Sequence, residues 1–166
     1  MNFYVRNRSW SDRFLPEIKR IVGPRIIQTA PDMLDWHEAT DLLTLDGKDL
    51  RIAARVRRHG YSNRFPHDFT IRTETASGVP TELSKIVNGK GDWLFYGHAD
   101  SASGNLESWY LIDLKAFRAA LIRRGAQGLT WGNKHNSDGT CFTWFDVRSF
   151  PADPPLVVAS GSIPQV

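Results

Sequence analysis

Several ionisable side chains stand where a charge has chemical consequences. Asp41 begins an alternating run over residues 41–45, in which Leu43 and Leu45 share its face. A carboxylate at the end of an apolar strand face is costly unless something binds it. Glu82 and Lys85 stand three positions apart in a helix-like run, so both can face one site. A turn or cap role for Asp41, and a solvated ion pair for Glu82 and Lys85, are the alternatives.

A second group of residues is basic and aromatic. Residues 51–64 carry five arginines and one tyrosine, on an expected strand and the polar segment after it. The planar guanidinium group suits phosphate, and a tyrosine ring can stack on a base. A solvated strand face is an equally good interpretation. The candidate nucleic-acid contacts are Arg51, Arg55, Arg57, Arg58, Tyr61 and Arg64.

Hydrophobic periods and turn signals predict the elements around these residues. A helix is expected over residues 11–22, and Gly23 with Pro24 is expected to end it. Turn formers at residues 46–49 separate two alternating runs, which predicts a hairpin with Asp41 opposite Ala54. The expected strands are residues 41–45, 50–58, 68–73 and 92–96, and a helix capped by Thr81 is expected at residues 81–87.

Side chains alternate between the two faces of a strand, and this alternation assigns faces to the expected strand at residues 68–73. Phe69 and Ile71 are its expected core residues, which puts Asp68, Thr70 and Arg72 on the other face. A strand, a helix and a strand are then expected at residues 109–114, 115–124 and 140–145.

The end of the chain contains fewer strong signals. Residues 132–139, which include His135, are interpreted as a loop, and Cys141 as an inert buried side chain. The tail at residues 151–166 is rich in Pro and Ser. We therefore expect a single α/β domain over residues 1–166 with a central mixed sheet, an αβββαβ core at about residues 11–100 and a β-α-β extension at about residues 105–150.

Composition narrows the class of protein. The chain has 166 residues, a net charge of +3 and a pI near 9.2, a mild attraction towards polyanions. With Cys141 alone, no internal disulfide can form, which favours a reducing, cytoplasmic setting. No apolar run reaches the roughly 18 residues of a membrane span. The spacing of His and Cys shows no zinc motif, and no phosphate-binding glycine motif occurs.

The predicted order of helix, three strands, helix and strand over residues 11–96 resembles the core of the PD-(D/E)XK nuclease superfamily. The chain is also similar to small uncharacterised proteins encoded by tailed bacteriophages. In the nuclease family, acidic residues hold Mg²⁺ and a lysine assists the attacking water. The resemblance implies a restriction-endonuclease-like core, with Asp41 as the strand aspartate and Glu17 as a helix glutamate.

The acid-x-Lys pattern of the family is absent from the expected strands of this chain. Some family members carry the second acid or the lysine on the following helix, where Glu82 and Lys85 stand. The resemblance therefore implies Mg²⁺ or Mn²⁺ held by Asp41, Asp68 and Glu82, with Lys85 or Arg72 stabilising the developing negative charge. Asp68 could instead pair with a nearby basic side chain.

The expected function is Mg²⁺-dependent endonuclease activity on DNA in the cytoplasm, the host cytoplasm if the protein is phage-encoded. One alternative is a catalytically inactive protein with the same fold that binds nucleic acid or a host protein. Another is an accessory or inhibitor protein that blocks a partner and has no nucleic-acid role.

Overall fold

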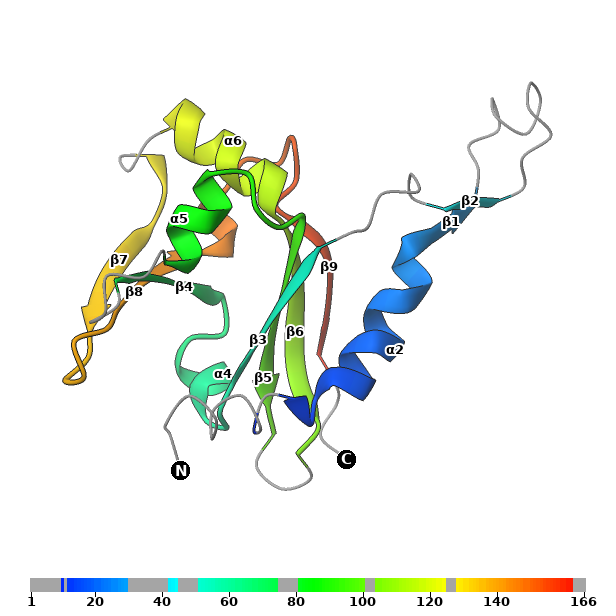
Figure 1. The fold of residues 1–166 in the computed structure, drawn as a ribbon, viewed down its shortest axis with the longest axis horizontal. Helices are drawn as coiled ribbons and strands as arrows, with labels where there is room; N and C mark the ends of the chain where they lie inside the picture. The colour runs from blue at the N-terminus through cyan, green and yellow to red at the C-terminus, as the bar shows by residue number, and fades with distance from the viewer. Residues whose placement is uncertain are drawn as a thin grey trace. The chain divides into compact units, whose positions relative to one another are not determined.

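The computed structural model describes residues 10, 12–29, 42–44, 51–74, 81–100, 104–124 and 128–162 (Figure 1), with the backbone alone at 25–29, 42–44 and 124. The protein is of the mixed α/β class, as expected. Its chain forms two compact units, Met1–Asp49 and Leu50–Val166.

The first unit contains helix α2 (Leu15–Ile26), which continues past the expected stop at Gly23 and Pro24. The stop prediction was wrong for a steric reason. A proline ring fixes φ near a helical value, and part of the clash that drives the preceding residue from the helix involves the Cβ of that residue. Gly23 has no Cβ, so the helix loses one hydrogen bond at Pro24 and continues to Ile26.

The expected hairpin between the first two strands is also wrong. Strand β2 (Leu42–Thr44) pairs antiparallel with β1 (Ile27–Thr29), while β3 (Ile52–Arg57) pairs in parallel with β5 (Trp93–Ala99). The predicted partner of Ala54, Asp41, lies outside the described residues, and Ala54 pairs with Phe95 of β5. The three strands expected to be successive in one sheet, β2, β3 and β4 (Asp68–Glu74), belong to three different sheets.

The second unit contains a mixed four-stranded sheet of order β3-β5-β6-β9. Its members β6 (Leu106–Asp113) and β9 (Val157–Ser162) pair antiparallel with their neighbours. All seven residues of β5, His98 included, are buried, as is typical of a strand whose two faces are both covered. Strand β9 lies in the segment that the sequence predicts as a tail, and it completes the edge of this sheet.

A three-stranded antiparallel sheet of order β4-β8-β7 forms the other layer. Strand β8 (Cys141–Asp146) lies in the middle, and β7 (Trp131–His135) occupies the segment predicted as a loop, so that prediction was wrong. Phe69 and Ile71 of β4 are fully buried, which confirms the predicted core face. Phe69 stacks on Phe145 with ring centroids 5.4 Å apart, in a core that includes Phe117 of helix α6 (Leu114–Arg124).

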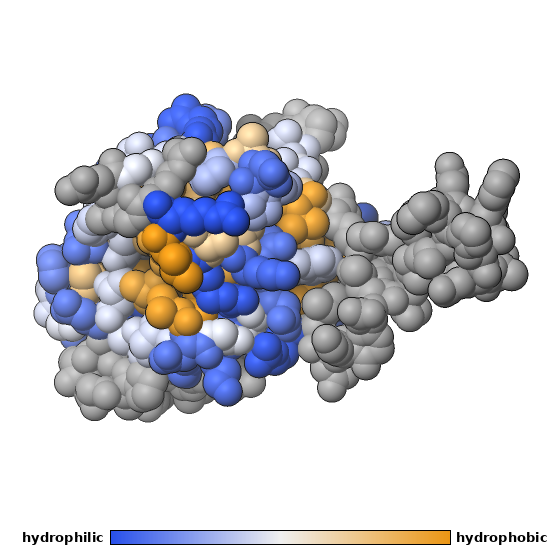
Figure 2. Space-filling model, turned by 90° about the horizontal axis from the view of Figure 1, so that it is seen from above, coloured by the Kyte–Doolittle hydropathy of each residue, from blue (hydrophilic) through white to orange (hydrophobic). Residues whose placement is uncertain are grey.

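Short helices complete the unit. Helix α5 (Glu82–Val87) begins at Thr81, whose hydroxyl accepts a hydrogen bond from Ser84 N at 3.2 Å, as predicted. Helix α4 (Tyr61–Arg64) precedes β4, and a 3₁₀ helix η2 (Val147–Ser149) follows β8. Figure 2 looks onto the side of the second unit where α5 and α6 lie in Figure 1, and it shows apolar side chains gathered among hydrophilic ones. Across the described ranges, no helix is long and apolar enough to cross a membrane.

Candidate metal centre

The expected metal ligands are considered first. Asp41 lies outside the described residues. Asp68 begins β4, directly opposite Asp146 of β8. Burial raises the pKa of Asp68, and the nearby Asp146 carboxylate raises it further. Asp146 is itself paired with Arg148, at 2.6 Å between Oδ2 and Nη2.

Glu82 has a different set of contacts, on the free edge of β4. Its Oε2 lies 3.0 Å from Arg55 Nη2 and accepts a hydrogen bond from Arg72 N at 3.0 Å. Arg55 Nη1 donates to the carbonyl oxygen of Thr70 at 2.9 Å. Burial lowers the pKa of Arg55, and the Glu82 carboxylate acts in the opposite direction. Together, Glu82 and Arg55 satisfy backbone groups that an edge strand leaves unpaired.

The structure does not bring Asp68 and Glu82 together. Glu82 contacts Arg72, four residues along β4 from Asp68, which is about 13 Å at the usual rise of a strand. Lys85 is exposed on α5. Arg72 lies with its guanidinium carbon 5.4 Å from the centre of the Phe142 ring. Its buried Nε has no hydrogen-bond partner among the residues that the structure describes.

Arg51 and Arg55, both candidate nucleic-acid contacts, have carboxylate partners among the described residues. Arg55 pairs with Glu82, as above. Arg51 Nε lies 3.2 Å from Asp92 Oδ2, and that carboxylate oxygen also accepts from Arg51 N at 2.9 Å. These hydrogen bonds from Arg51 lower the pKa of Asp92. Arg58 is exposed at the end of β3.

The other candidates gather around α4. The guanidinium carbon of Arg57 lies 4.3 Å from the centre of the Tyr61 ring, and that of Arg64 lies 5.5 Å from the centre of the Phe65 ring. Phe65 is 40% exposed. Stacked pairs of this kind present both a positive charge and an aromatic ring to a ligand. We call Arg57, Tyr61, Arg64 and Phe65 the α4 surface.

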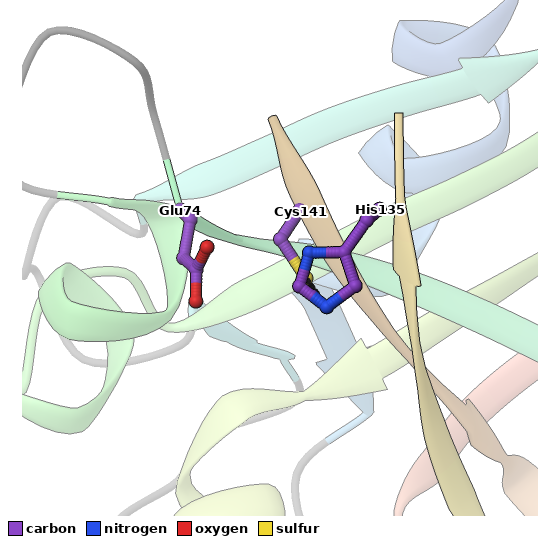
Figure 3. A group of neighbouring side chains, drawn as sticks. All are labelled: Glu74, His135 and Cys141. Carbon is purple, nitrogen blue, oxygen red and sulfur yellow. Dashed lines mark hydrogen bonds between the residues drawn. The ribbon is translucent and has the colours of Figure 1, made fainter. Parts of the chain in front are cut away.

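A group of possible metal ligands lies in the three-stranded sheet, at residues that the sequence analysis did not select. Glu74 of β4 and His135 of β7 both pair with Cys141 of the middle strand, so the three form one row across the sheet (Figure 3). One ligand atom from each lies within 4.8 Å of the other two. Cys141 Sγ lies 3.9 Å from His135 Nε2. We call these residues the triad.

A β-bulge brings Glu74 into the row. The register of β4 on β8 shifts between Arg72 and Glu74, so Glu74 rather than Thr73 lies opposite Cys141. In an unbroken strand, Glu74 would point away from the face of Phe69 and Ile71, because side chains alternate. The extra residue reverses its direction, a known effect of bulges.

A tight turn holds His135 opposite Cys141. Thr140 donates to Asp138 Oδ1 from both N, at 3.0 Å, and Oγ1, at 2.6 Å. Gly139 adopts a φ of 77°, which favours glycine. Asp138 followed by Gly139 is a hairpin signal, and it could have identified this pair from the sequence. Gly132 and Asn133, both weak strand formers, concealed strand β7.

The donor set indicates the class of ion. Thiolate and imidazole are ligands for zinc and other transition metals, whereas Mg²⁺ prefers oxygen atoms. Zinc bonds of about 2.0–2.3 Å place tetrahedral ligands about 3.5 Å apart, so modest side-chain rotations would close the triad on an ion. Cys141 is 2% exposed, while Glu74 and His135 are exposed, so an ion would reach the triad from their side.

A pocket of about 280 Å³ adjoins the triad on the same face of the sheet. Glu74 belongs to both. The next row of the sheet, formed by Ile71, Thr143 and Asn133, leads from the triad into the pocket. The residues that line it are Thr73, Glu74, Leu83, Leu121, Leu129, Trp131, Asn133, Thr143 and Phe145.

Comparison with known proteins does not place the chain in a family. No family model matches it, and no significant match is found to a curated protein or to a solved structure. The resemblance to PD-(D/E)XK nucleases and to phage proteins therefore stays a prediction.

Proposed function

We propose that this protein is a metal-dependent hydrolase whose ion is held by Glu74, His135 and Cys141, with zinc as the preferred ion. The observation that supports it is the convergence of a carboxylate, an imidazole and a thiol from three adjacent strands. Three protein ligands leave one position of tetrahedral zinc for water, as in catalytic zinc sites. A bound zinc ion supplies water of lowered pKa for hydrolysis.

The Mg²⁺ or Mn²⁺ implied by the nuclease resemblance is the second choice of ion. Mg²⁺ requires octahedral oxygen ligands, and the triad offers one carboxylate. Mn²⁺ accepts carboxylate but gains less from a thiolate than zinc does. We therefore rank zinc before Mn²⁺ and Mn²⁺ before Mg²⁺.

Metal content tests the proposal directly. Purified protein equilibrated with zinc and then dialysed should retain one ion per chain. Glu74→Gln, His135→Asn and Cys141→Ser should each weaken binding at least tenfold, because each removes one ligand. His59→Asn is the matched control, since His59 is exposed and outside the triad. Wild-type protein that retains no zinc, or triad variants that retain it as wild type does, would refute the proposal.

DNA phosphodiester hydrolysis is the reaction that we propose to test first. The net charge and the α4 surface favour a polyanionic substrate. Supercoiled and single-stranded DNA should be cut in the presence of zinc or Mn²⁺, and Glu74→Gln should abolish cutting. Cutting that survives Glu74→Gln and is lost in a folded Glu82→Gln variant would instead support the metal site expected from the nuclease resemblance.

Nucleic-acid binding without cleavage is the second candidate function, and the α4 surface is the observation that favours it. Affinity for DNA should fall steeply with salt, because binding to phosphate releases counterions. Replacing Arg57 and Arg64 with Ser should reduce affinity and flatten the salt dependence. Arg123→Ser, an exposed charge change on α6, is the control. Equal effects of these substitutions would remove the α4 surface from consideration.

A further inference from the structure

The pocket beside the triad has an apolar wall and a polar end. Leu83 of α5 and Leu121 of α6 face the sheet across it, and Phe145 and Trp131 form part of its floor. Trp131 is 39% exposed, so the pocket is open on the side of β7. A ligand could therefore enter along β7 and cover apolar side chains that are now partly in water.

The polar end of the pocket lies towards the triad. The hydroxyl of Thr143 donates to Asn133 Oδ1 at 2.7 Å, which fixes the amide of Asn133 one row from His135. Thr73 Oγ1 is buried, and within the described part of the chain it has no hydrogen-bond partner. Buried hydroxyls normally have a partner, so this one is available to a ligand or to water.

The size of the pocket sets the size of its occupant. An apolar cavity of roughly 150 Å³ can hold benzene, and this pocket has about 280 Å³. A six-membered ring with a short polar substituent therefore fits. Along the sheet, successive residues on one face lie about 7 Å apart, so such a substituent could extend from the row of Asn133 to the row of His135.

We infer that the pocket binds the aromatic ring of small acyl compounds, while their polar acyl head reaches the ion held by Glu74, His135 and Cys141. This inference rests on the metal site proposed above, and it gives that site a substrate class other than the DNA that is tested first. The ring packs in the pocket over the row of Asn133 and Thr143, and the head group lies beside Glu74. The sheet positions the ion, and the two helices select the ring.

Two hydroxamates test this assignment, because both bind zinc through the same head group and differ in a phenyl or a methyl group. After metal content is established, calorimetry measures the affinity of the zinc-loaded protein for benzohydroxamate and for acetohydroxamate. We expect benzohydroxamate to bind at least tenfold more tightly. Leu121→Trp should fill the pocket and abolish the preference, with metal content and acetohydroxamate affinity unchanged.

Two further variants keep the test decisive. Ile122→Trp is the control, because Ile122 is the next residue of α6 and is 85% exposed, so the preference should remain. Leu83→Trp fills the pocket from α5 and replaces Leu121→Trp if that variant does not fold. Zinc binding with equal affinities for the two hydroxamates would overturn the inference alone. A protein without bound zinc would refute the proposed function, and the inference with it.

Discussion

The Glu82–Arg55 ion pair is the part of the structure that mutation can test most directly. Replacing Glu82 with Ala leaves Arg55 without its carboxylate and Arg72 N without its acceptor. Breaking a buried ion pair costs about 3–5 kcal/mol, and an unsatisfied backbone N–H costs about 1–3 kcal/mol. The two side chains are 17% and 24% exposed, so water replaces part of each interaction. We therefore expect the free energy of unfolding to fall by about 3 kcal/mol, the lower end of the ion-pair range.

Urea denaturation followed by circular dichroism measures this loss. Glu82→Gln should cost less than Glu82→Ala, because the amide oxygen can still accept from Arg72 N. Replacing Arg55 with Met and Glu82 with Leu together should cost less than the sum of the single changes, since no buried charge is left unpaired.

Lys85→Ala is the matched control for this series. Lys85 is exposed on the same helix, and its replacement should change stability by no more than about 0.5 kcal/mol. A Glu82→Ala variant as stable as Lys85→Ala would refute the structural role of Glu82 and return it to the list of catalytic candidates.

Three further predictions concern individual residues. Burial lowers the pKa of His98 from 6.5 to about 4, so between these pH values the unfolded chain binds a proton that the folded chain does not. The free energy of unfolding should therefore fall by about 3 kcal/mol on acidification across this interval, at about 1.4 kcal/mol per pH unit. In urea denaturation at a series of pH values, His98→Gln should lose less stability than the wild type by this amount. Gly97→Ala should lower the free energy of unfolding, measured by urea denaturation, by about 1–3 kcal/mol, because the added Cβ would lie 2.8 Å from Leu106 Cδ2 in the buried sheet. An unchanged stability would contradict this packing. Replacing a helical Gly with Ala usually stabilises the helix by about 0.5–1 kcal/mol. We expect Gly23→Ala to lack this stabilisation, because a Cβ on the residue before a proline clashes with the proline ring in a helix. A higher melting temperature for Gly23→Ala would contradict our account of this helix.

Local elements of this fold could be predicted because their signals are local. Alternation in residues 68–73 predicted a strand with Phe69 and Ile71 inside, and both are fully buried. The helix cap at Thr81 followed from residue type and position. Strand partners could not be predicted in this way. The turn formers at residues 46–49 suggested a hairpin, yet β3 pairs with β5 about 40 residues further on. That choice depends on packing across the whole unit, which no short window of sequence contains.

The candidate metal centre shows the same division between local and distant signals. His135 and Cys141 flank a short turn, so a hairpin prediction would have placed them opposite each other. Glu74 is separated from them by more than 60 residues and by a register shift. Regular alternation gives the wrong face for Glu74, because the bulge reverses its direction. A sequence search for metal ligands at short spacing therefore finds at most two of the three residues.

Strand β4 explains why the two sets of acidic residues have different roles. As an edge strand, it leaves backbone groups unpaired, and the carboxylate of Glu82 is one of the groups that satisfies them. The positive charge of Arg55, 3.0 Å from Glu82 Oε2, would repel a cation bound to the same carboxylate. The bulge a few residues later turns Glu74 towards a thiol and an imidazole, where no arginine competes for it among the described contacts of the triad. The structure of β4 therefore makes Glu74 a better metal ligand than Glu82, although the sequence resemblance favours Glu82.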